Sequence, residues 1–213
     1  MKKKIAVAVS LLLVLALSIG GTIAWLTDTS DTVVNTFTVG KVELKLEETG
    51  ANKDGTTELF KKDYAIVPGA TLAKDPTITV SANSEKCYVF VRITEANNSI
   101  TVGSATQDIV QWNILSGWNQ AYAADDGSEY VYWKEVAKAT TATTLQVLTG
   151  GTETNQTGQV TINDNLTAEN TPTTAPTLTF KAAAIQADNI QKTDVWAALP
   201  SAFTNGITSI TMS

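Results

Sequence analysis

The segment KVELKL at residues 41–46 alternates apolar and charged side chains at every position. A period of two places Val42, Leu44 and Leu46 on one face of an extended strand and the charged residues on the other face. A helix would scatter these apolar side chains, whereas an antiparallel sheet can bury one of its faces and leave the other in water. The segment therefore predicts a β-fold with one buried sheet face.

Further segments are rich in Thr, Val and Ile, whose side chains favour strands. They are residues 76–81, 87–94, 109–115, 129–137, 143–148, 158–163, 177–185 and 206–212. Turn-forming residues separate them, as in Pro68-Gly69 and the Asp-Asp-Gly stretch at 125–127. Many short strands with turns between them predict an all-β fold, a jelly-roll-like antiparallel β-sandwich with long polar loops.

One or two short helices are expected near the C-terminus. Residues 188–199 could form a helix that Asp188 or Thr193 caps and Pro200 ends. The polar stretch at 150–175 indicates a hairpin and a long loop, not a separate domain. We therefore expect a single sandwich domain over residues 40–213.

The first 24 residues have the layout of a secretory signal peptide. Three lysines at positions 2–4 precede an uncharged apolar run from residue 5 to residue 19, and Thr22 and Ala24 are small residues at the positions that a signal peptidase inspects. We expect cleavage between Ala24 and Trp25, with residues 1–24 removed. The mature chain would be secreted, in the extracellular matrix or at the cell surface.

A membrane anchor is the alternative for this segment. Extended through Leu26, the apolar run is long enough to span a bilayer. However, Gly20 and Gly21 interrupt it, and no basic cluster follows to stop transfer. The sequence favours a chain that touches the membrane only before cleavage.

The charge of the mature chain argues against nucleic acid as a partner. Cleavage would take the net charge from −6 to −9, because residues 1–24 contain three lysines and no acidic residue. An acidic chain without basic clusters is poorly suited to bind phosphate backbones. Cys87, the only cysteine, lies in the apolar run CYVFVRI and is expected to be a small core residue.

The sequence offers no recognisable catalytic centre. It contains no histidine, which excludes His-based triads and the HExxH zinc site. The acidic residues are scattered, and turn chemistry accounts for the possible calcium ligands at 125–127 and 163–165. We therefore expect no enzyme, no catalytic residue, no cofactor and no metal.

A cell-surface module that binds glycans is one alternative function. Aromatic rings on one exposed face could stack on sugars, and the candidates are Trp112, Trp118, Tyr122, Tyr130, Tyr132 and Trp133. Tyr130 and Tyr132 would share a strand face while Trp133 points the other way, so part of this set belongs to the core.

Four stretches carry a resemblance to a known family. They are GGTIAWLTDTSDTVVNTFTVGKVEL at 20–44, with the turn residues Asn35, Phe37 and Gly40, then IVPGATLAKDPTITVSANSEKCYVFVRI at 66–93, WNILSGWNQAYAADDGSEYVYWKEV at 112–136, and FKAAAIQADNI at 180–190. Together they resemble the TasA/camelysin family of secreted biofilm-matrix proteins. The stretch Ala82-Asn83-Ser84 departs from the family pattern.

The resemblance implies a structural role in an extracellular fibre. Members of the family are cut by a signal peptidase of the SipW type, fold as jelly-roll sandwiches and self-assemble into fibres. In the fibre-forming members, the released N-terminal segment inserts as a strand into the next subunit, and we therefore expect this chain to self-assemble into a homopolymeric fibre. Here that donor segment would be residues 25–39, with the apolar anchors Trp25, Leu26, Val33, Val34, Phe37 and Val39.

Two further readings of the chain stay open at this stage. Residues 25–39 could be an ordinary first strand folded into their own domain. Some camelysin-type members carry a peptidase label, but a chain without histidine or a zinc motif gives that activity no chemical support.

Overall fold

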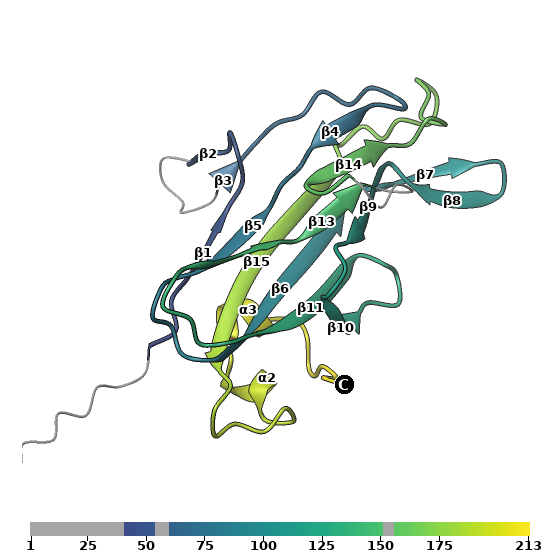
Figure 1. Ribbon diagram of the computed structural model, residues 1–213. Coiled ribbons are helices and arrows are strands. Elements are labelled where there is room, and N and C mark those ends of the chain that lie inside the picture. The colour runs from purple at the N-terminus through teal and green to yellow at the C-terminus, as the bar shows by residue number, and fades with distance from the viewer. Residues whose placement is uncertain (1–40, 54–59, 151–155) are drawn as a thin grey trace, which may run out of the picture. The chain divides into compact units, whose positions relative to one another are not determined.

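The computed structural model describes residues 41–53, 60–150 and 156–213, and in this part the chain is built of antiparallel strands and two short helices (Figure 1). The strands are β1 Leu44–Glu47, β2 Asn52–Lys53, β3 Phe60–Lys61, β4 Thr71–Ala73, β5 Thr77–Val80, β6 Cys87–Ala96, β7 Ser99–Val102, β8 Ala105–Asp108, β9 Val110–Ile114, β10 Asn119–Ala123, β11 Glu129–Val136, β12 Thr143–Gln146, β13 Leu148–Gly150, β14 Gln159–Ile162 and β15 Thr177–Gln186. The helices are α2 Val195–Ala198 and α3 Ser201–Thr204. The predicted fold class, an all-β antiparallel sandwich, is confirmed.

One layer of the sandwich is a four-stranded sheet in the order β10-β11-β6-β15. Its two long strands, β6 and β15, pair along ten residues, from Cys87 opposite Gln186 to Ala96 opposite Thr177. Figure 1 shows β15 lying beside β6 along its length.

The other layer contains two sheets, in the orders β1-β5-β12 and β13-β9-β14-β4. Val147 joins them, because its N–H donates to the carbonyl of Pro76 at 3.3 Å and its own carbonyl accepts from the N–H of Leu115 at 2.8 Å. The hairpins β2-β3 and β7-β8 lie outside these sheets.

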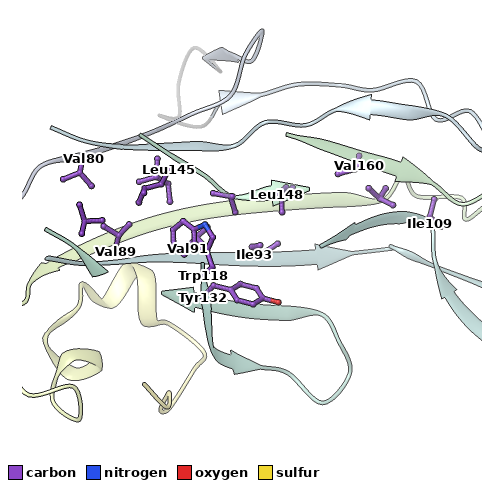
Figure 2. Close-up of a cluster of buried hydrophobic side chains, with 14 of the residues drawn as sticks. Val80, Val89, Val91, Ile93, Ile109, Trp118, Tyr132, Leu145, Leu148 and Val160 are labelled. Atoms are coloured by element: carbon purple, nitrogen blue, oxygen red, sulfur yellow. The ribbon is translucent and has the colours of Figure 1, made fainter. Parts of the chain in front are cut away.

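The main core lies between the two layers, and Figure 2 shows its side chains there. Strand β6 contributes Val89, Val91 and Ile93, which are fully buried, and the second layer contributes residues such as Val80 and Leu145. Cys87 is part of this core, as expected, and burial raises the pKa of its thiol to about 11.

A second core covers the opposite face of β6. Tyr88 and Phe90 alternate with the first set and pack against the C-terminal residues 187–212, including Phe203 of α3. Arg92 lies on the same face, where its guanidinium donates to the Glu129 carboxylate and to the carbonyl of Phe203, both at 2.5 Å. The C-terminal segment is therefore tied to the sheet by apolar packing and by one buried cation.

Most of the predicted strands are confirmed within one to three residues of their ends. The strand expected at 206–212 is wrong: these residues have no strand assignment, and Thr211 makes one backbone hydrogen bond to Ala121 at 2.9 Å. The helix expected at 188–199 shortens to α2, and α3 follows Pro200. Packing against the sheet holds this segment in place, so it needs little regular structure of its own.

Candidate strand-acceptor groove

The outer edge of β15 is open in the described part of the chain. This strand ends the order β10-β11-β6-β15, and no described strand pairs with its second edge. An open ten-residue edge presents a row of unpaired peptide groups and is a template for another strand.

The hydrogen-bond register shows which peptide groups face this edge. Ala187 N–H donates to the carbonyl of Lys86 at 2.8 Å, so these two residues form a hydrogen-bonded pair in register with β6 and β15. Because such pairs alternate along an antiparallel ladder, the peptide groups of Leu178, Phe180 and Ala182 point away from β6. Their side chains face the core between the layers.

Strand β1 ends the other layer at the same side of the sandwich. It is the first strand of the order β1-β5-β12, and it lies close to β15 without pairing with it. Ser81 N–H donates to the carbonyl of Glu43 at 2.8 Å, so the peptide groups of Leu44 and Leu46 also point away from their neighbour β5. Among the residues that the structure describes, the two layers thus each present an open edge here.

A groove of about 800 Å³ lies between these edges. Its apolar lining comes from both layers and from the segment before β4, and consists of Leu46, Ile66, Leu72, Pro76, Val110, Val160, Ile162, Ala175, Pro176, Leu178 and Phe180. Val160 and Ile162 are almost fully buried and form its floor, while Phe180 is half-buried. The groove exposes core side chains that an added strand would cover.

One end of the groove is polar. Lys74 Nζ lies 2.6 Å from Glu48 Oε2, and the two side chains are only 12% and 11% exposed. The Tyr64 hydroxyl donates to the other oxygen of Glu48, and burial together with this carboxylate raises the pKa of Tyr64. Lys74 also lies 5.1 Å from the centre of the Phe180 ring. This cluster fixes β1, β4 and β15 relative to one another at the end of the groove.

A smaller cavity of about 260 Å³ adjoins the groove. It shares Ile66 and Pro176 with the groove and adds Ile109, Leu166 and Pro172. The apolar surface therefore continues beyond the N-terminal end of β15, along the residues that precede Thr177.

The opposite edge of the same sheet is partly covered by the C-terminal segment. The edge strand there is β10, and Thr211 of the C-terminal segment donates to Ala121 in its middle. The chain covers part of one sheet edge with its own C-terminus and leaves the β15 edge open among its described residues.

The site residues predicted from sequence cannot be placed in this geometry. The cleavage pair Ala24 and Trp25 and the anchors Leu26, Val33, Val34, Phe37 and Val39 lie outside the described residues. Sequence reasoning missed the groove itself, whose lining comes from separate segments at 46–48, 62–66, 72–76, 160–162 and 175–180 and from Val110. Only the pairing order, which leaves β15 and β1 at open edges, could have revealed it.

The aromatic set considered for glycan binding is divided between core and surface. Trp118 is only 8% exposed, and its Nε1–H donates to the carbonyl of Gln146 at 2.9 Å. Tyr130 stacks on Tyr132 and meets the edge of Trp112, which donates to the carboxylate of Glu95 at 2.7 Å. Trp118 is therefore a core residue and not part of an exposed platform.

The described residues contain neither a metal-binding cluster nor a membrane-spanning helix. No three side chains among His, Cys, Asp and Glu come together there in a way that could hold a metal ion. No helix in the same residues is long and apolar enough to cross a membrane.

Comparison with known proteins adds no relative. No family model, no curated protein and no solved structure matches the chain. The proposal that follows therefore depends on the groove and on the sequence.

Proposed function

We propose that this protein is a secreted structural subunit of an extracellular-matrix fibre, in which residues 25–39 of one copy insert as a strand into the groove of another. The observation that carries this proposal is the edge of β15, with which no described strand pairs, beside an apolar groove of about 800 Å³. Strand addition to an open edge gains main-chain hydrogen bonds, and the pockets beside the edge select the side chains.

The length of the segment supports this occupant. Residues 25–39 are fifteen residues, which span about 50 Å when extended at about 3.3 Å per residue. Strand β15 has ten residues, or about 33 Å on the same scale. The segment is thus long enough to follow the whole open edge and reach the adjoining cavity.

The expected cleavage after Ala24 gives the assembly a switch. Before cleavage, residues 25–39 would be tethered to the membrane by the apolar run at 5–19, and a SipW-type signal peptidase would release them. Donation from each copy to the next is a heterologous contact that does not close on itself, so it propagates a filament. The resemblance to the TasA/camelysin family points to the same assembly.

The test compares two proteins, one of residues 25–213 beginning at Trp25 and one of residues 40–213, by negative-stain electron microscopy and sedimentation. Filaments from the first and none from the second are the expected result. A fluorescent peptide of residues 25–39 should bind the shorter protein, whose groove would be unoccupied.

Two results would overturn the proposal. Monodisperse particles in both samples would remove the polymer. Filaments in both samples would show that residues 25–39 are not the donor. The peptide explains one way to the first result. If residues 25–39 fill the groove of their own copy, the protein of residues 25–213 would be a monomer that does not bind the added peptide, whereas the shorter protein would bind it.

A further inference from the structure

Resting on the function just proposed, we infer that the incoming strand has a fixed face: Val33, Phe37 and Val39 enter the groove, and Val34 stays outside. Trp25 belongs to the inserted face and Leu26 to the outer face. Four of the six apolar residues in the segment would then act as anchors, and two would not.

The geometry of β15 requires such a division. Leu178 and Phe180 point their side chains into the core between the layers and their peptide groups toward the open edge. A strand added at that edge continues the sheet, so its side chains also alternate between the core and the outside. Since alternation depends on odd and even positions alone, the division is the same for parallel and antiparallel insertion.

The composition of the segment decides which face enters. Between residues 33 and 39 the odd positions carry Val33, Asn35, Phe37 and Val39, and the even positions carry Val34 and two threonines. The odd face is therefore much the more apolar of the two. A shift by one residue would exchange the faces and leave the groove filled mainly by threonine.

The size of the groove fits this part of the segment. The lining residues on the β15 side run from Ala175 to Phe180, which corresponds to about 20 Å of extended chain. Val33 to Val39 spans about the same length at about 3.3 Å per residue. The apolar floor of Val160 and Ile162 would receive the valines and Phe37.

Asn35 is the polar member of the inserted face. The groove provides polar partners for it at one end, where Tyr64 contacts the largely buried pair of Lys74 and Glu48. An amide that both donates and accepts can join such a cluster without leaving an unpaired group.

The experiment uses neighbouring residues of the segment as matched controls. In the protein of residues 25–213, Val33→Asp places a carboxylate on the inserted face and Val34→Asp places it on the outer face. Phe37→Asp and Thr36→Asp form a second pair. The concentration at which filaments first sediment is measured for each variant beside the unmodified protein.

We expect Val33→Asp and Phe37→Asp to raise this concentration on the order of 100-fold, because a charge cannot be buried in the apolar groove without a partner. Val34→Asp and Thr36→Asp should change it by less than about threefold. Val33→Asp and Phe37→Asp should still bind a fluorescent wild-type peptide of residues 25–39, because the groove of each variant is unchanged and stays unoccupied.

The outcomes separate this inference from the proposed function. If Val33→Asp and Val34→Asp changed the sedimentation concentration equally, or Val34→Asp changed it more, the fixed face would be overturned. Filaments of the unmodified protein would still support the proposed function in that case. Loss of peptide binding in Val33→Asp would also overturn the fixed face, because the defect would then lie in the acceptor. Absence of filaments from the unmodified protein would overturn the function and this inference together.

Discussion

Proline substitutions at Ala182 and Ala183 should destabilise the sandwich to very different extents, although the two alanines are neighbours in β15. Proline lacks an N–H, so it is tolerated in a sheet only where that group faces an open edge. The register assigns the N–H of Ala183 to the ladder with Phe90 and the N–H of Ala182 to the open edge.

The expected magnitudes follow from these assignments. Ala183→Pro leaves the buried carbonyl of Phe90 without its donor, which costs about 1–3 kcal/mol, and the proline ring pushes the strands apart, for a total of about 2–4 kcal/mol. Ala182→Pro loses no ladder bond and should cost less than about 1 kcal/mol.

The assay is urea unfolding followed by circular dichroism. With an m-value of about 2 kcal/mol/M, Ala183→Pro should lower the midpoint by about 1–2 M, and Ala182→Pro by less than about 0.5 M. Ala182→Val and Ala183→Val serve as references, since valine adds a similar volume but keeps the N–H. Equal destabilisation by the two prolines, after this correction, would refute the assignment of the open edge.

The remaining predictions concern buried polar groups. Lys74→Met should destabilise the protein by about 3 kcal/mol, because it leaves Glu48 half-paired in a buried site; the double variant with Glu48→Leu should recover part of that loss in the same urea assay, and no recovery would contradict the coupling. Arg92→Met removes the donor to the Phe203 carbonyl and should make residues 187–213 the first region cut in limited proteolysis, whereas an unchanged cleavage pattern would show that apolar packing alone holds them. The thiol of Cys87 should react with Ellman's reagent only after unfolding. The pKa of this thiol rises from 9.0 to about 11 on folding. Between these pH values the thiol is protonated in the folded state and ionised in the unfolded state, so the free energy of unfolding should fall by about 2–3 kcal/mol between pH 9 and pH 11. In Cys87→Ala the free energy of unfolding should fall less over this pH range. An identical fall in both proteins would contradict the raised pKa of the thiol.

Local patterns in the sequence were enough to predict most of the strands of the two layers and the fold class. The alternation in KVELKL and the β-branched runs at 87–94 and 177–185 became β1, β6 and β15 because each carries a core-facing stripe. The short strands β4 and β10 were not predicted, because three to five residues without clear alternation carry too little signal. The C-terminal strand expected at 206–212 failed because its apolar residues Ile207, Ile210 and Met212 pack on a sheet face rather than pair along a sheet edge.

The sequence by itself determined the period of each strand, the buried position of Cys87 and the apolar character of residues 25–39, since these depend only on neighbouring residues. Only the tertiary structure decided which of the described strands lie at the edges, and that the edges of β15 and β1, with which no other described strand pairs, flank one groove. The physical reason is that an edge is defined by the strand that is missing beside it. Such a property follows from the order of pairing among segments far apart in the chain, and no local pattern of residues encodes it.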